Sequence, residues 1–129
     1  MTDQTAMYQP VPNYDFTLTV PIAGSQSPAV DIGDMSLLGF ICPAAIEATT
    51  VQLSLQASPT LAGAYTQVYA DGVRVTLPFT VNNYALFDNY LRAIFIGLRF
   101  IKITLETAAG VAVAQATAAR VFTLITRKF

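Results

Sequence analysis

The stretch Val51–Asp71, VQLSLQASPTLAGAYTQVYAD, decides the fold class of this chain. Its first part alternates, with Val51, Leu53, Leu55 and Ala57 on one side of an extended backbone and Gln52, Ser54 and Gln56 on the other. A period of two is typical of a strand with one buried and one hydrated face. Ser58–Pro59 ends this strand, Tyr65–Ala70 resumes with β-favouring residues, and Asp71–Gly72 turns the chain. The stretch therefore predicts a hairpin-type β unit with a neutral, solvated outer face.

Other short runs with turn signals between them predict further strands. Pro21 cannot donate to a ladder, so the first of these strands is expected to lie at an edge or to end there. Two of the runs are apolar enough for central strands, Met35–Cys42 and Arg120–Phe129. The remaining candidates are Phe16–Ile22, Ala29–Ile32, Val73–Leu77, Phe79–Val81, Arg99–Glu106 and Val111–Ala119.

Two segments are ambiguous. Residues 84–96 approach helical spacing but show no clear cap, and we interpret them as a loop with one helical turn. Val111–Ala119 is rich in alanine, a helix former, yet its valines and Thr117 favour a strand. Together the segments predict an all-β fold, a two-sheet antiparallel sandwich that is jelly-roll-like with about eight strands. Residues 14–129 form one domain in this interpretation, and residues 1–13, marked by Pro10 and Pro12, form an extended N-terminal arm.

Charge is scarce in this sequence. Of its 129 residues, 53% are hydrophobic and 12% charged, about half the usual charged share. Either the surface is made of neutral polar residues, or much of it is covered by partners, and an apolar excess on a small protein favours coverage. No apolar run reaches the roughly 20 residues of a transmembrane helix. Residues 1–4 lack the basic start of a secretory signal, so synthesis in a cytoplasm is expected.

The few charges are divided unevenly along the chain. Residues 1–73 carry six acidic and no basic residues, and residues 74–129 carry seven basic and two acidic ones. The halves therefore sum to −6 and +5 within a net charge of −1. The charges either mix on the folded surface or form acidic and basic faces that pair between copies. No Lys/Arg cluster suggests nucleic-acid binding.

Catalytic patterns are missing from the sequence. No histidine is present, which excludes Ser-His-Asp and Cys-His schemes and His-based metal sites. Cys42 lies within an apolar run and is expected to be a buried, inert thiol. Asp31 and Asp34 flank Gly33 and are interpreted as a turn pair, with calcium binding as the less favoured alternative. We predict no enzyme, no catalytic residue, no cofactor and no metal site.

The order of segments resembles small structural proteins of tailed bacteriophages, the capsid decoration or cement proteins. The residues that carry this resemblance lie within residues 35–126: Thr49–Ser58, Tyr65–Gly72, Gly97–Ile103 (GLRFIKI) and Gln115–Ile125. The resemblance implies a jelly-roll-like sandwich on the outside of a phage head, made in the bacterial host cytoplasm. It implies a role in binding major-capsid subunits to one another, without catalysis.

The expected partners are the major capsid protein and further copies of the chain, as a dimer or trimer, but neither nucleic acid nor a membrane. Contacts are expected from the arm, through Tyr8, Val11, Tyr14 and Phe16, and from the other terminus, through Arg127 and Phe129. The alternative is a carbohydrate- or receptor-binding sandwich of a phage tail or fibre, because Gly97–Lys102 (GLRFIK) also resembles discoidin-like sugar-binding domains. Such a site would use Tyr65, Tyr69, Tyr84 and Tyr90 as its aromatic surface.

Overall fold

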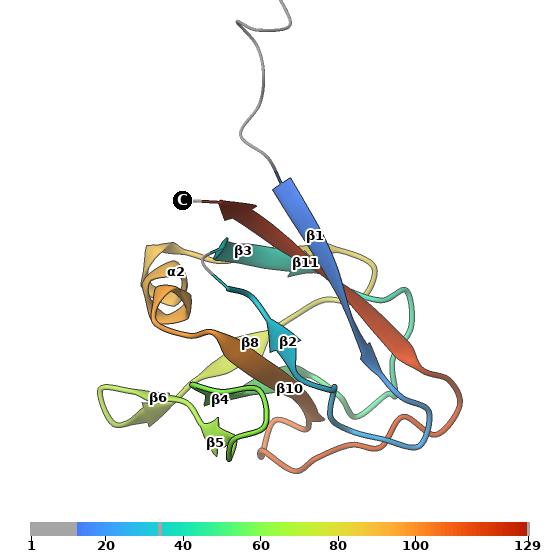
Figure 1. The fold of residues 1–129 in the computed structure, drawn as a ribbon. Coiled ribbons are helices and arrows are strands. Elements are labelled where there is room, and N and C mark those ends of the chain that lie inside the picture. The colour runs from blue at the N-terminus through green and yellow to red at the C-terminus, as the bar shows by residue number, and fades with distance from the viewer. Residues whose placement is uncertain (1–12, 34, 129) are drawn as a thin grey trace, which may run out of the picture.

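The computed structural model describes residues 13–33 and 35–128, which form two antiparallel sheets packed face to face and one short helix (Figure 1). The four-stranded sheet has the order β1-β11-β3-β9, with β1 at Asn13–Val20, β11 at Arg120–Lys128, β3 at Met35–Ile41 and β9 at Tyr84–Leu86. The five-stranded sheet has the order β2-β10-β4-β5, and β8 also pairs with β4. Its strands are β2 at Val30–Asp31, β10 at Phe100–Glu106, β4 at Gln52–Ser58, β5 at Thr66–Gln67 and β8 at Thr76–Pro78. The β6–β7 hairpin, Tyr69–Ala70 with Val73–Arg74, projects beside it.

The strand order is that of a jelly roll. If β5 and β8, which both pair with β4, are taken as one strand position, successive strands alternate between the two sheets except that this position follows β4 within the five-stranded sheet. The first strand then lies beside the last, and β1 pairs with β11 along its whole length, from Asn13 opposite Arg127 to Val20 opposite Arg120. The predicted jelly-roll-like sandwich is therefore confirmed, and β3 and β11 are central strands, as the apolar runs indicated.

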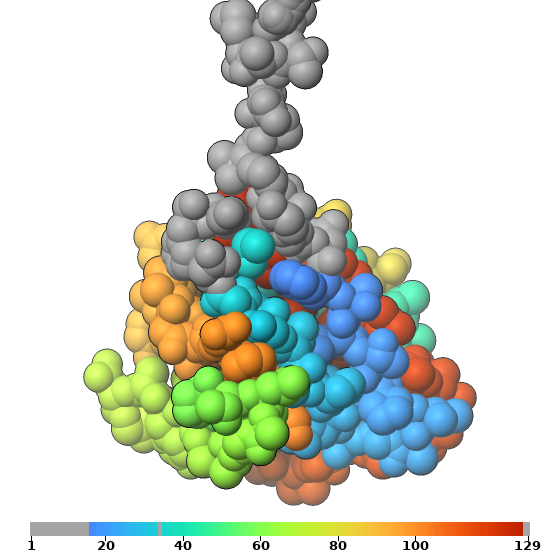
Figure 2. Space-filling view, viewed as in Figure 1, coloured from blue at the N-terminus to red at the C-terminus, as the bar shows by residue number. Residues whose placement is uncertain are grey.

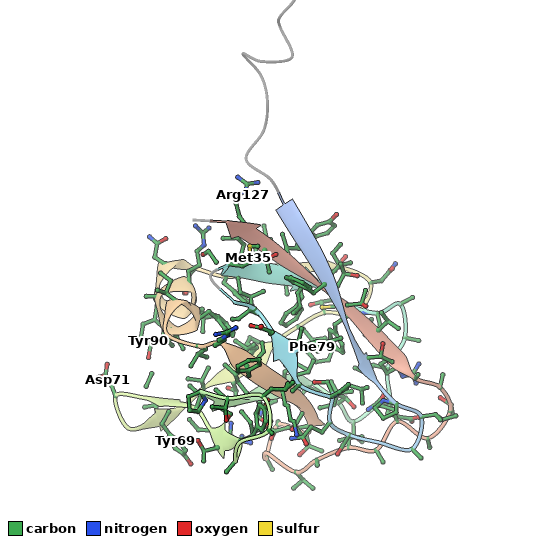
Figure 3. The ribbon with its side chains drawn as sticks, in the orientation of Figure 1. Met35, Tyr69, Asp71, Phe79, Tyr90 and Arg127 are labelled. Carbon is green, nitrogen blue, oxygen red and sulfur yellow. The ribbon has the colours of Figure 1, made fainter. Side chains whose placement is uncertain are left out.

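The core lies between the sheets and is built from alternate residues of the paired strands. In the β4–β10 pair, Leu53 lies opposite Leu105 and Leu55 opposite Ile103, and all four side chains are buried. Phe40 makes edge-to-face contacts with Phe87 and Phe122, a favourable geometry for aromatic rings. Figure 3 shows Phe79 in the interior between the two sheets, where its ring packs against Phe122.

The interpretation of residues 84–96 as a loop is wrong. This segment forms β9 and then the helix α2, Asn89–Ile96, at one side of the sandwich (Figure 1). The side chain of Asp88 is the missing cap, because its carboxylate accepts a hydrogen bond from the Leu91 N–H at 2.9 Å. Phe95 is buried and stacks on Phe87, which holds the helix against the core.

The expected strand at Val111–Ala119 is also wrong. Apart from one bridge between Ala112 and Glu106, the segment is irregular. It is held by Gln115, whose fully buried amide oxygen accepts hydrogen bonds from the Glu47 N–H and the Arg120 Nε, both at 3.0 Å. The backbone of the segment bonds outside a ladder: Gln115 pairs with Ala23 and Gly24, and the N–H groups of Ala116 and Thr117 donate to Glu47 Oε1.

Gly39 is required by the close approach of β3 and β9. A Cβ at this position would collide with the backbone oxygen of Ala85. We expect Gly39→Ala to lower the free energy of unfolding by about 1–3 kcal/mol, because β9 must move away from β3. Urea unfolding followed by circular dichroism measures this change.

Gly97→Ala is the matched control for that substitution. The Cβ of an alanine there would lie 3.9 Å from the nearest atom, the Ile94 oxygen, and the backbone has φ −84°. Its unfolding free energy should stay within about 0.5 kcal/mol of the unsubstituted chain. Equal effects at the two glycines would contradict the close packing of β9.

Candidate interaction surfaces

The outer face of the five-stranded sheet carries a hydrogen-bonded polar network and is not the plain solvated face expected from the sequence. Ser54 is fully buried, and Gln52 and Gln56 are half-buried. Gln56 is the centre: its amide oxygen accepts from Gln26 Nε2 and Thr104 Oγ1, both at 3.1 Å, while its Nε2 donates to the Gln67 side-chain oxygen at 3.1 Å. The network therefore ties β4 and β10 to β5 and to the loop after β1.

The same face holds a charged pair, which corrects the expectation that it lacks charge. Arg74 donates to both carboxylate oxygens of Glu106, and Gln52 Nε2 donates to Glu106 Oε1 at 3.1 Å. Burial raises the pKa of Glu106, but hydrogen bonds from Arg74, Ser54 and Gln52 outweigh it and hold that pKa below its usual value. Because Glu106 is 2% exposed, this carboxylate cannot act on a solvent-borne ligand.

Arg74 also fixes the β6–β7 hairpin over the sheet. Its Nη2 lies 3.4 Å from the Gln67 side-chain oxygen, and Gln67 Nε2 donates to the Leu55 carbonyl at 2.9 Å. Lys102 Nζ lies 4.4 Å from the centre of the Tyr65 ring, a cation–π contact. Figure 2 shows the yellow-green β6–β7 hairpin as a projecting lobe, and Figure 3 places Tyr69 and Asp71 toward its outer end.

The outer face of the four-stranded sheet is open and almost without charge. Phe122, Leu124 and Thr126 of β11 are buried, so the alternate residues of β11 lie on the other side of the sheet. Arg127 is the charged residue among the side chains described on this face. Other residues of this outer face are Thr17, Thr19, Gly39, Ile41, Tyr84, Leu86, Val121, Thr123 and Ile125, and the register adds Asn13 and Asp15 of β1 and Ser36 of β3.

Exposure on this outer face is highest at its β9 edge. Tyr84 is 67% and Leu86 69% exposed, and Val121 near the other side is 46% exposed. Ile41, Thr123 and Ile125 between them are half-buried by their neighbours. Such a surface of β-branched, aromatic and threonine side chains can bind a partner by excluding water.

Two hollows flank the α2 helix. One, of about 350 Å³, lies between the end of β4 and the start of β10 and is lined by Ala57, Ser58, Pro59, Gly97, Leu98 and Arg99. The other, of about 220 Å³, lies between the β7–β8 segment and the first turn of α2 and is lined by Val73, Arg74, Val75, Thr76, Tyr90 and Leu91. Both hollows are open to solvent.

The residues predicted as contact sites lie at one end of the four-stranded sheet or outside the described part. Tyr8, Val11 and Phe129 lie outside the described residues, as do residues 1–12 of the predicted arm. Tyr14 lies in β1 opposite Thr126, and Phe16 is half-buried against the core. Arg127 is exposed at the end of β11 (Figure 3). The structure thus brings the start of β1 beside the end of β11.

Of the two most exposed β9 side chains, the sequence analysis missed Leu86 and named Tyr84 only for a sugar-binding surface. The signal that could have found them is the alternation Tyr84-Ala85-Leu86 between the Asn82–Asn83 turn and the Asp88 cap. Arg74 and Glu106 were also missed as a pair, because 31 residues separate them and only the fold brings them together.

Cys42 and the Asp31–Asp34 pair are the titratable groups that the sequence analysis singled out. Cys42 is buried, and burial raises the pKa of its thiol. The described residues contain no group of three Cys, Asp or Glu side chains that could hold a metal ion. Asp31 is paired with the exposed Arg99 at 3.3 Å, and the hydrogen bond from Arg99 lowers its pKa; Asp34 lies outside the described residues.

No described helix is long and apolar enough to cross a membrane. No family model, curated protein or solved structure matches this chain. We therefore infer the function from these surfaces.

The Glu106–Arg74 pair makes stability depend on pH. We expect Glu106→Gln to lower the unfolding free energy at pH 7 by about 2–3 kcal/mol, because Arg74 loses its charged partner in a nearly buried site. The folded-state pKa of Glu106 is lowered, so its contribution is present at neutral pH. That contribution is lost as the pH falls from the unfolded-state pKa of Glu106, near 4.5, toward its lower folded-state pKa. The difference between the two proteins should therefore shrink on acidification.

Urea unfolding at pH 7 and at about pH 3 measures the effect. Asp31→Asn is the control, because both partners of the Asp31–Arg99 pair are exposed and the pair contributes less than about 1 kcal/mol. A loss at Glu106 that is the same at both pH values would contradict the charged-pair explanation.

Proposed function

We propose that this chain is a non-enzymatic structural protein of a virion, which binds the outside of a tailed-phage capsid and stabilises contacts between major-capsid subunits. The observation that carries the proposal is the sparsely charged outer face of the four-stranded sheet, whose charged positions are Arg127 and, by the β1–β11 register, Asp15. A free small domain normally places charges on both outer faces of a sandwich to remain soluble. Here the polar and charged groups gather on the five-stranded sheet, which leaves the other sheet suited to a partner.

The proposed binding mechanism is burial of apolar surface. Each Å² of apolar surface removed from water contributes about 25 cal/mol, so a face of this kind binds by area and fit. A shell partner with a similarly neutral surface would fit, because no buried charge has to be matched across the contact. This mechanism suits a protein that stays bound for the life of a particle.

The ends of the chain support the same proposal. Asn13 at the start of β1 lies opposite Arg127 near the end of β11, so the described chain begins and ends at the same end of this sheet. In the proposal, Tyr8, Val11 and Tyr14 of the arm extend the contact from that end. The partners are the major capsid protein and a further copy of the chain, and the place of action is the capsid surface.

Co-sedimentation with expanded empty capsids of the phage that encodes the chain tests the proposal. Val121→Lys places a charge on the outer face of the four-stranded sheet, where the unmodified side chain is 46% exposed. We expect it to weaken shell binding about tenfold or more, since the ammonium group would have to be desolvated.

Val111→Lys is the control, because Val111 is 61% exposed in the loop after β10 and lies outside this sheet. It should leave shell binding within about twofold of the unmodified chain. Failure of the unmodified chain to sediment with shells would overturn the capsid role, and equal loss in both variants would overturn the assignment to this face.

A carbohydrate- or receptor-binding role is the second candidate. It is favoured by the 220 Å³ hollow, where Tyr90 lies beside Thr76 and Arg74. Tyr90 is 55% exposed and Tyr69 60% exposed, so both rings can stack on a sugar. A glycan array separates the two roles: binding that disappears in Tyr90→Ala would favour the sugar site over the shell role.

A further inference from the structure

The β9 strand ends the four-stranded sheet with hydrogen-bonding groups that face outward. Asn83 accepts from the Cys42 N–H and Phe87 donates to the Leu38 carbonyl, both toward β3, at 2.9 and 2.8 Å. Ala85 lies between them, opposite Phe40. In an antiparallel ladder the residues that bond a given neighbour alternate, so Tyr84 and Leu86 direct their N–H and C=O groups away from β3. Within the described part of the chain, nothing bonds those four groups.

We propose that this β9 edge pairs with the β9 edge of a second copy of the chain, around a two-fold axis at Ala85. This inference deepens the self-association part of the proposed function and rests on it. The axis places Tyr84 of each copy opposite Leu86 of the other. Residues that face each other in this way exchange both of their backbone bonds, so the pair of strands forms four N–H···O=C bonds.

The register follows from the length of the strand. If the axis lay at Tyr84 or at Leu86 instead, that residue would face its own copy, and no other outward-facing residues of Tyr84–Leu86 would face each other. Two backbone bonds would then form within this strand instead of four. Only the axis at Ala85 uses every outward-facing group of β9. The edge is therefore complementary to itself, which is the requirement for a closed dimer.

The side chains agree with this pairing. Tyr84 and Leu86 lie on the same outer face, and both are about two-thirds exposed. The two-fold axis brings each tyrosine ring against a leucine of the partner copy, an aromatic–aliphatic cross-strand contact. Ala85 is half-buried on the core side, so a small residue lies where the two strands come closest.

The β1, β2 and β8 edges carry charge or proline, which discourage strand pairing. A long or flat edge is usually protected by charge or by proline. β2 carries the Asp31–Arg99 pair, β8 ends in Pro78, and β1 contains Asp15 and is followed by Pro21. β9 consists of Tyr-Ala-Leu, with neither a charge nor a proline.

The ends of β9 also tolerate the two-fold arrangement. Asn82 and Asn83 precede the strand and Asp88 follows it, so the axis brings the carboxylate of each copy toward the amides of the other. Like charges therefore do not meet at this edge. The paired molecule would have a continuous eight-stranded sheet whose outer face joins the two sparsely charged surfaces proposed to bind the shell.

Light scattering after size exclusion, over a range of protein concentrations, tests the pairing. The unmodified chain should move from 13.9 kDa toward about twice that mass as its concentration rises. The double variant Tyr84→Lys with Leu86→Lys should remain a monomer, because lysines would face lysines across the axis. The double variant Tyr84→Glu with Leu86→Glu should do the same.

Mixing the lysine and glutamate variants separates lost pairing from lost folding. Each lysine then faces a glutamate, so the mixture should regain the dimer mass in a salt-dependent manner. Val111→Lys should dimerise like the unmodified chain. A chain that stays monomeric at all concentrations, a lysine variant that still dimerises, or a mixture that stays monomeric would each overturn the inference.

Cysteine variants test the register. Opposed residues of a hydrogen-bonded pair have Cα atoms about 5.5 Å apart, within the range of a disulfide. A mixture of Tyr84→Cys and Leu86→Cys chains should form an intermolecular disulfide on oxidation, while either chain alone should not; native Cys42 is buried. Cross-linking of either single variant with itself would overturn the axis at Ala85.

These outcomes are independent of shell binding. Monomeric chains that still sediment with capsids would overturn the β9 pairing and leave the proposed capsid role in place. Dimers that do not bind shells would overturn that role and leave the pairing in place.

Discussion

The pairing of β4 with β10 is the interaction on which the rest of this sandwich depends. It sets Leu53 opposite Leu105 and Leu55 opposite Ile103, and these buried side chains form the centre of the core. Because side chains alternate across a strand, the same register also fixes Gln52, Ser54 and Gln56 on the opposite face. One register thus determines both the packing between the sheets and the polar chemistry outside them.

The two outer faces differ in their polar and apolar side chains. On the five-stranded sheet, the Gln56 network and the Glu106–Arg74 pair satisfy the half-buried polar groups and hold the β6–β7 hairpin in place. This use of polar groups is structural, since Glu106 is shielded from solvent. On the four-stranded sheet there is no comparable network among the described side chains, and apolar residues remain open to a partner.

This asymmetry connects the low charge of the chain to its proposed role. Charges are few, and several are used in pairs: Glu106 with Arg74, Asp31 with Arg99, and Glu47 with Arg120 at 3.8 Å. The Asp31–Arg99 and Glu47–Arg120 pairs join the acidic and basic halves of the sequence, whereas Glu106 and Arg74 both belong to the basic half, so the fold brings part of the unevenly distributed charge together. The neutral face and the β9 edge are the surfaces left for proposed contacts with the shell and with a second copy.

The sequence by itself determined the fold class, because period-two alternation, proline positions and apolar runs are local properties that predict strands and their buried faces. Central positions for β3 and β11 followed from the same patterns. The tertiary structure decided what the polar faces do, since Glu106 meets Arg74 and Gln56 meets Gln26 only after distant strands pair. It also decided that α2 forms and that Val111–Ala119 does not become a strand, because Phe95 packing and Gln115 hydrogen bonds outweigh local propensity.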